Sequence, residues 1–210
     1  MSIQDAYTNW SRTYDEDRNR TRDLDQQVTH TTLSGEHFGR IVETGCGTGK
    51  NTAFLAEIGD TVTALDFSAG MLARAREKVR AANVTFVEAD LTQVWPVENR
   101  SADLVVCNLV LEHIENLHFI FAQAARILVP GGRFFVCELH PFRQYQGTQA
   151  TFQRSDGAVL IEAYVHHISD FLAAAEASGL SLAGLKEWWH VEDEGKPPRL
   201  ASFVFAKSTT

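Results

Sequence analysis

The chain has 210 residues, of which 44% are hydrophobic and 22% are charged. This balance is typical of one globular domain with a packed core, and it excludes a disordered chain. The formal net charge is −8, from 27 acidic residues against 19 lysines and arginines. A surface of that sign disfavours general binding to nucleic acid and to anionic membranes, so we expect neither as a partner.

The chain has three cysteines, Cys46, Cys107 and Cys137. An odd number argues against a framework of disulfides, and their spacing is not that of zinc ligands. We interpret them as free thiols, which predicts a cytoplasmic protein without a bound metal. Residues 1–20 are polar and charged, which argues against a signal peptide. No apolar run approaches the roughly 20 residues that a membrane-spanning helix needs.

The amino-terminal residues 1–35 are polar, with scattered aromatic side chains. We interpret them as a helical lid whose charged side chains are mostly solvated. From Arg40 onward, short apolar runs alternate with segments of helical periodicity, which predicts βαβ units and a parallel sheet. The expected strands are 41–44, 61–66, 84–88, 103–108 and 133–138.

Three helices are expected between these strands. The first covers 51–58, the second is capped by Ser68, and the third runs from Leu117 to the stop signal at 130–132, Pro-Gly-Gly. Residues 91–100 are interrupted by Pro96 and are not expected to form a helix.

The carboxyl-terminal part has a different pattern. Ser169 or Asp170 is expected to cap a helix that ends at Ser178. The strands 182–189 and 200–207 are too close in sequence for a crossover helix, so they must pair antiparallel. Segments 150–154 and 158–165 predict a β-hairpin inserted after the fifth strand.

One α/β domain therefore covers 1–210, with a Rossmann-like, seven-stranded, mostly parallel sheet and helices on both faces. Within it we expect an amino-terminal lid (1–35), a cofactor-binding core (40–138), a small hairpin cap (140–167) and a terminal helix with an antiparallel strand pair (168–210).

The most informative motif is the glycine-rich turn at 45–49, Gly-Cys-Gly-Thr-Gly, which follows a strand and opens a helix. Such a turn lets a ligand approach bare backbone at a helix amino terminus. The phosphate-binding loop pattern fails, because Thr44 stands where it needs glycine and Asn51 where it needs serine or threonine. The dinucleotide pattern is only partial, since Lys50 replaces its third glycine.

Three acidic residues at strand ends narrow the ligand. Glu43 precedes the turn, where a carboxylate repels pyrophosphate and suits a cation. Asp66 ends the second strand, where a carboxylate can accept hydrogen bonds from ribose hydroxyls. Asp90 follows the third strand and can accept a hydrogen bond from an exocyclic amine such as that of adenine. Together they predict a ligand with ribose, adenine and a positive charge, but without phosphates.

These motifs resemble the class I S-adenosylmethionine-dependent methyltransferases of small molecules, and are most similar to the ubiquinone and menaquinone biosynthesis group. Five segments carry the resemblance, and the first is the glycine-rich segment 43–49. The others are 66–71, with Asp66-Phe67-Ser68 and Met71, then 89–91, then 101–114, which contains Leu-Glu-His-Ile, and finally 126–132. The resemblance implies methyl transfer from S-adenosylmethionine by in-line displacement, with S-adenosylhomocysteine as product. It implies the following cofactor-binding residues: Tyr14, Glu43, Gly45, Cys46, Gly47, Gly49, Asp66, Phe67, Met71, Asp90, Leu91, Asn108 and His113.

The methyl acceptor is expected to be a small molecule held above the ends of the fourth and fifth strands. His140 leaves the sheet at its carboxyl edge, so we expect it as a general base. Three segments are expected to close the acceptor pocket: 7–14, 138–142 and the hairpin at 150–165. A monomer or a homodimer is expected.

Two alternatives stay open. One is a regulatory protein that binds the cofactor without turnover. The other is an oxidoreductase of the NAD type, against which Glu43 and Lys50 argue.

Overall fold

The computed structural model describes Ser11 and residues 14–15, 19–147, 151–154, 157–160 and 163–209. Tyr7 and Trp10 of the expected lid lie outside these residues. The elements follow the chain as α2 (Arg20–Leu33), β1 (Phe38–Thr44), α3 (Thr52–Ile58), β2 (Gly59–Asp66), α4 (Ala69–Lys78), β3 (Val84–Glu88), β4 (Ala102–Asn108), the 3-10 turn η1 (Leu111–His113), α5 (Leu117–Ile127), β5 (Leu128–Leu139), α6 (Pro141–Tyr145), β6 (Thr151–Arg154), β7 (Gly157–Leu160), α7 (Ile168–Ala177), β8 (Leu180–Trp188), η2 (Val191–Asp193) and β9 (Leu200–Lys207).

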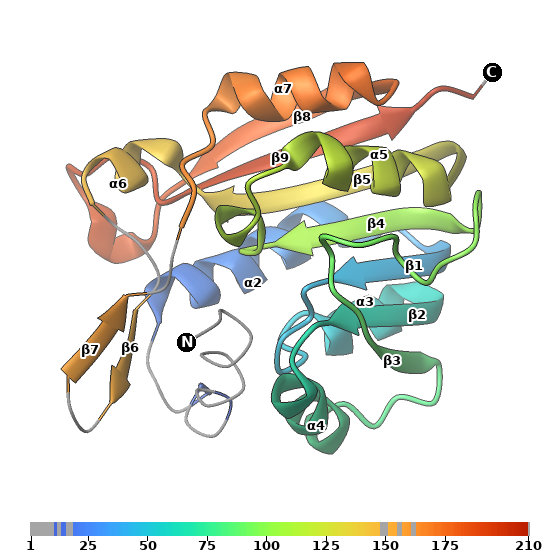
Figure 1. The fold of residues 1–210 in the computed structure, drawn as a ribbon, viewed down its shortest axis with the longest axis horizontal. Helices are drawn as coiled ribbons and strands as arrows, with labels where there is room; N and C mark the ends of the chain where they lie inside the picture. The colour runs from blue at the N-terminus through green and yellow to red at the C-terminus, as the bar shows by residue number, and fades with distance from the viewer. Residues whose placement is uncertain are drawn as a thin grey trace.

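A seven-stranded sheet in the order β3-β2-β1-β4-β5-β9-β8 forms the centre of the molecule (Figure 1). Strands β1 to β5 are parallel, whereas β9 runs antiparallel to both β5 and β8. The predicted Rossmann-like sheet with a terminal antiparallel pair is therefore confirmed. The carboxyl ends of the parallel strands meet at one edge, where ligands bind in sheets of this kind.

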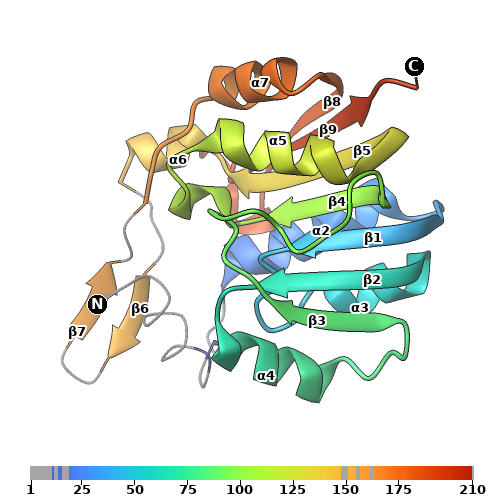
Figure 2. The ribbon, with the colours of Figure 1, turned by 45° about the vertical axis from the view of Figure 1, so that its right-hand side comes forward.

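Helices cover both faces of the sheet (Figures 1 and 2). On one face α5 and α7 pack with Phe134, Phe203 and Phe205, and on the other α2 and α3 pack with Ile41 and Phe135. No helix lies between β3 and β4, as expected. There the indole of Trp95 is 1% exposed and fills the first of these cores.

The segment Pro-Gly-Gly at 130–132 lies inside β5 and not in a separate turn. The expected stop of α5 comes earlier, at Ile127, and Leu128 already has extended backbone. Ala102 of β4 pairs with Leu128 of β5, and the next pair joins Leu104 with Arg133. Between these two pairs β5 has more residues than β4, which interrupts the regular pairing of the strands.

Helix α7 is capped by His167, not by Ser169 or Asp170 as expected. The Asp170 carboxylate instead accepts a hydrogen bond from the His167 backbone N–H at 2.8 Å. This is the reciprocal arrangement of a capping box, in which the acid sits three residues inside the helix.

The inserted hairpin is confirmed as β6 and β7, which pair antiparallel from Thr151 with Leu160 to Arg154 with Gly157. Its turn residues, Ser155 and Asp156, lie outside the described part of the chain. The hairpin forms a sheet of its own on the side where the parallel strands end (Figures 1 and 2).

Candidate functional site

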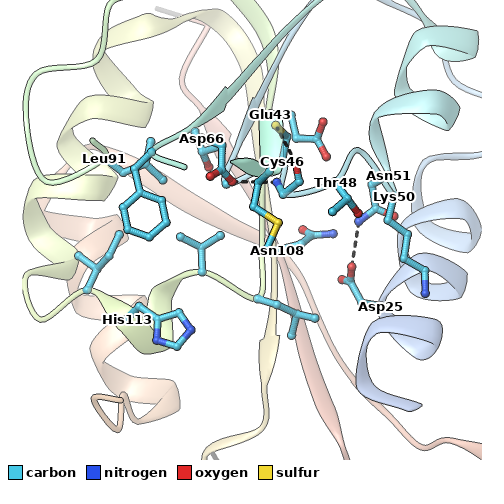
Figure 3. Close-up of a pocket in the computed structure, with 18 of the residues that line it drawn as sticks. Asp25, Glu43, Cys46, Thr48, Lys50, Asn51, Asp66, Leu91, Asn108 and His113 are labelled. Atoms are coloured by element: carbon cyan, nitrogen blue, oxygen red, sulfur yellow. Dashed lines mark hydrogen bonds between the residues drawn. The ribbon is translucent and has the colours of Figure 1, made fainter. Parts of the chain in front are cut away.

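A cavity of about 510 Å³ opens at the carboxyl ends of β1, β2 and β4 (Figure 3). Its size is that of a small-molecule site. The residues that line it are Tyr14, Arg22, Asp25, Glu43, Thr44, Gly45, Cys46, Gly47, Thr48, Lys50, Asn51, Asp66, Phe67, Met71, Asp90, Leu91, Thr92, Asn108, Leu109, Val110, His113 and Ile114. All the residues that the resemblance assigned to the cofactor are among them except Gly49.

The glycine-rich turn needs glycine for two different reasons. Gly45 has φ +69°, and a Cβ atom there would lie 2.1 Å from Val110 Cγ2. Gly47 has φ +53° and faces open space, because a Cβ atom there would have no heavy atom within 4 Å. Gly49, at φ +80°, instead packs on Val79 and Ala75 at the end of α4. It shapes the turn without lining the cavity.

Asp66 is fixed by the turn that it faces. Its Oδ2 accepts from the Gly47 N–H and its Oδ1 from the Ser68 N–H, both at 2.8 Å. Burial raises the pKa of this carboxyl to about 6, although the backbone donors of Ser68, Gly47 and Phe67 act in the opposite direction. A carboxylate has about four lone-pair sites, so Asp66 keeps acceptor capacity beyond these backbone donors.

Glu43 lies beneath the turn and is 4% exposed. Its Oε2 accepts from the Thr52 hydroxyl at 2.5 Å. Burial raises the pKa of Glu43 to about 8, the Thr52 bond lowers it, and the charges of Asp25 and Asp66 raise it further. A cation in the cavity would favour the ionised form of this carboxyl.

The residues expected beside adenine line one side of the cavity. Met71 and Leu91 are buried there, and the partly buried Phe67 lines the cavity beside them. Asp90 Oδ1 accepts from both the backbone N–H and the hydroxyl of Thr92, at 2.9 and 2.7 Å. Asp90 thus orders the loop after β3 and keeps its second oxygen available.

Tyr14 is held over the cavity by Arg22. The guanidinium lies 3.9 Å from the centre of the tyrosine ring, and its Nη1 donates to the Tyr14 backbone carbonyl at 2.6 Å. The neighbouring Asp15 accepts from Thr48 at 2.8 Å and pairs with Lys78 at 2.9 Å. Burial raises the pKa of the Tyr14 hydroxyl, and Arg22 opposes this shift.

Helix α2 contributes residues to the cavity lining that were not predicted from the sequence. The charged side chains of residues 1–35 were expected to be mostly solvated, but Arg22 and Asp25 are 8% and 4% exposed and line the cavity. Burial raises the pKa of Asp25 to about 6, while bonds from Asn51, Cys137 and Asn108 and the charge of Lys50 lower it. In the sequence, a buried face of α2 was indicated by the helical spacing of the apolar residues Leu24 and Val28. The polar Asp25 lies beside Leu24 on that face.

His140 does not line the cavity, contrary to its expected role as a general base. Its Nδ1 accepts from the Phe142 N–H at 3.1 Å, which caps α6, and its Nε2 lies 2.8 Å from Glu187 Oε1 on β8. Both ring nitrogens are therefore engaged in holding the fold. Position at the carboxyl edge of the sheet does not by itself orient a side chain into the site.

The segment 138–142 was expected to help close the acceptor pocket, but Glu138 and Phe142 do not line the cavity either. Glu138 is buried and its Oε1 accepts from the backbone N–H groups of Val110 and Leu111, at 2.9 and 3.0 Å, so it anchors the loop after β4. Phe142 is 48% exposed on α6, away from the lining. His113, which was assigned to the cofactor, does line the cavity, on the same loop.

The described residues contain no group of histidine, cysteine and acidic side chains that could hold a metal ion. All three cysteines are free and buried. None of the helices in the described ranges combines the length and the apolar character needed to cross a bilayer.

Comparison with known proteins identifies what the chain is similar to. Residues 42–136 match a family described as a methyltransferase domain. An uncharacterized methyltransferase of Emericella nidulans is 30% identical over 220 residues, which covers 86% of this chain and 76% of that protein. A demethylmenaquinone methyltransferase of Tropheryma whipplei is 36% identical over 107 residues, 49% of this chain and 43% of that protein. The chain thus spans less than half the length of this second relative.

A solved structure shows the same fold. It is an S-adenosylmethionine-dependent methyltransferase from Mesorhizobium loti, with a TM-score of 0.73 and 22% sequence identity. The superposition covers 86% of this chain and 96% of that one.

Proposed function

Because the chain belongs to the S-adenosylmethionine-dependent methyltransferases, we propose that it transfers a methyl group from S-adenosylmethionine to a small-molecule acceptor. The observation that carries this proposal is the cavity whose glycine-rich turn is flanked by the buried acids Glu43 and Asp66. Asp66, whose pKa of about 6 leaves it mostly ionised at pH 7, repels phosphates and attracts a cation, and a bound cation favours ionisation of Glu43. The two acids therefore favour S-adenosylmethionine over a dinucleotide.

The residues present fit this cofactor. Asp66 lines the cavity, and its carboxylate keeps acceptor capacity beyond its backbone donors for the hydroxyls of a ribose. Open space above Gly47 lets a ligand approach the turn closely. Met71 and Leu91 supply an apolar wall for a flat base.

When bound, the sulfonium supplies an activated methyl group. A bond forms between the acceptor atom and the methyl carbon while the carbon–sulfur bond breaks, and its electron pair stays on sulfur as the neutral thioether of S-adenosylhomocysteine. The chain's own contribution is to hold the two reactants in line and to exclude water. Tyr14, fixed by Arg22, covers the cavity for this purpose.

The acceptor side is formed by the loop that follows β4. Leu109, Val110 and Ile114 give it an apolar character, and His113 adds a polar group. The whole cavity, which must hold the cofactor as well, measures about 510 Å³, so it leaves room for a compact acceptor and not for a polymer. The position of the hairpin β6–β7 beyond the strand ends supports a cover over this side (Figure 1).

Turnover is tested by incubating the protein with methyl-labelled S-adenosylmethionine and fractionated cell metabolites. We expect labelled product in a fraction of small molecules, with one S-adenosylhomocysteine formed for each methyl group transferred. If the protein binds the cofactor but yields no labelled product in any fraction, the chain is a cofactor-binding protein without enzymatic turnover.

We also propose a cytoplasmic location and a monomeric or homodimeric state. The three free, buried cysteines support a reducing compartment. Light scattering of the purified protein measures its oligomeric state, and an assembly larger than a dimer would contradict this proposal.

A further inference from the structure

The short turn η1 is held from outside at both of its ends. On its amino side, Glu138 Oε1 accepts from the N–H groups of Val110 and Leu111. A 3-10 turn of three residues satisfies few of its backbone groups internally, and Leu111 and Ile114 are buried. Its remaining carbonyl groups therefore need partners from elsewhere in the fold.

The segment that leads from the hairpin to α7 supplies these partners. His166 Nε2 lies 3.1 Å from the Leu111 carbonyl oxygen and 2.8 Å from that of Ile114. Because a carbonyl oxygen only accepts, Nε2 carries a hydrogen and donates to both. The Tyr164 N–H donates to the Glu112 carbonyl at 2.7 Å. This one segment thus bonds three carbonyl groups of the turn and its end.

The same segment is also bonded to the other connection of the hairpin. Gln144 Nε2 on α6 donates to the Tyr164 carbonyl at 3.4 Å, and the Tyr145 hydroxyl is hydrogen-bonded to His167 Nδ1. The chain enters the hairpin from α6 and leaves it towards α7, along the edge where the parallel strands end (Figures 1 and 2). The two connections therefore form one bonded unit.

The turn that this unit holds is also a wall of the cavity. Val110, His113 and Ile114 line the cavity, whereas His166 is half-buried and does not. His166 thus bonds the backbone of the turn whose side chains would contact a ligand. Any displacement of the hairpin connections either moves this wall or breaks the two bonds of His166.

We propose that His166 is a positioning residue that couples the hairpin cap (140–167) to the wall of the cofactor cavity. This inference rests on the proposed function. Coupling between two sites is reciprocal, so a cofactor that orders the turn also orders the hairpin connection, and an ordered connection favours the bound cofactor. This order of events would bring the cap over the acceptor side once the cofactor is in place.

Amide hydrogen exchange, followed by mass spectrometry, tests the coupling with S-adenosylhomocysteine as the ligand. Exchange is compared with and without saturating ligand in residues 109–114, several of which line the cavity, and in 163–168, which do not. We expect the ligand to slow exchange about threefold or more in both segments. Strand β8 does not line the cavity either and is the internal reference, in which we expect no comparable change.

Two variants test whether the coupling passes through His166. His166→Phe keeps an aromatic ring beside Phe171, whose ring lies edge-on at 6.0 Å, but removes the N–H donor. We expect the ligand still to protect 109–114 in this variant, and to slow exchange of 163–168 less than about 1.5-fold. His166→Gln carries an N–H donor at its end and should restore the protection, which a role in packing alone would not produce.

His118→Phe is the matched control, because it makes the same change at an exposed histidine on α5 that does not line the cavity. We expect the ligand to protect both segments in this variant as in the natural chain. Titration calorimetry of each protein establishes the ligand concentration that saturates it.

Protection confined to 109–114 in the natural chain, or equal to that of β8, would overturn the coupling even if no variant folds. Undiminished protection of 163–168 in His166→Phe would overturn the role of His166. If calorimetry detects no binding of S-adenosylhomocysteine to the natural chain, the proposed function itself fails, so the two failures are distinguishable.

Discussion

Buried acids define this site at the scale of single residues. Glu43 and Asp66 occupy positions that the sequence pattern identified, since Glu43 is the penultimate residue of β1 and Asp66 ends β2. Their burial and raised pKa values were not predictable from the motif, because they depend on how closely the turn, α2 and the loop after β4 enclose them.

Asp66→Ala tests the ribose contact. We expect S-adenosylhomocysteine to bind at least about tenfold more weakly, because the variant loses charge-assisted hydrogen bonds worth roughly 1.5–3 kcal/mol each. Titration calorimetry measures the affinity, and circular dichroism checks that the variant is folded. Unchanged affinity in a folded variant would remove Asp66 from the site.

The pH dependence of stability tests the environment of Glu43. Its pKa in the folded protein, about 8, exceeds the ordinary value of 4.5, so its contribution to stability is full below pH 4.5 and is lost as the pH rises through 8. Asp25 and Asp66, with pKa values of about 6, are largely ionised above pH 7. We expect the melting temperature of the ligand-free protein to fall between about pH 7 and about pH 8, and this contribution to level off at higher pH.

Glu43→Gln should flatten this decline, since the amide does not titrate. The comparison needs only melting curves of the two proteins in matched buffers. A decline of the same size in both would show that Glu43 is not the titrating group.

At the scale of elements, the turn between β1 and α3 depends on its contact with the loop after β4. Gly45→Ala would place a Cβ atom 2.1 Å from Val110 Cγ2 at a positive φ. We expect a loss of several kcal/mol in unfolding free energy or loss of ligand binding, measured by urea denaturation and calorimetry.

Gly35→Ala separates backbone strain from this clash. Gly35 has φ +83°, but no heavy atom lies within 4 Å of a Cβ position there, and it does not line the cavity. We expect a cost of about 1 kcal/mol and unchanged ligand affinity. Equal effects of the two variants would argue against the contact with Val110.

Helix α6 depends on its cap, His140. We expect His140→Ala to cost about 0.5–2 kcal/mol in unfolding free energy, the range for loss of a helix cap, and to leave cofactor affinity and turnover near their natural values. Denaturation and enzyme kinetics measure the two quantities. A large fall in turnover with unchanged stability would restore His140 as the general base. His37→Ala, at an exposed pair with Asp60, is the control and should change stability by less than about 0.5 kcal/mol.

The elements themselves were largely predictable. Apolar runs of period two and capping residues such as Ser68 are local signals, and Ser68 indeed accepts from the Met71 N–H at 3.3 Å. The errors occur where tertiary contacts decide: β5 begins at Leu128 because it pairs with Ala102, and α7 begins at His167 because Asp170 bonds back to it.

At the scale of the whole molecule, the order of the strands explains which residues meet. Motifs far apart in the sequence converge because β1, β2 and β4 end at the same edge of the sheet. The contribution of α2 was not predictable in this way. Its polar sequence conceals a buried face, and only the packing of Leu24 and Val28 under the sheet turns Asp25 towards the cavity.

The central claim is that this cavity binds S-adenosylmethionine, and titration calorimetry of the natural chain tests it most directly. We expect saturable binding of S-adenosylmethionine and S-adenosylhomocysteine at one site per chain, and no measurable heat with NADH, because the ionised Asp66 disfavours a pyrophosphate. Saturable binding of NADH without binding of S-adenosylmethionine would contradict this claim.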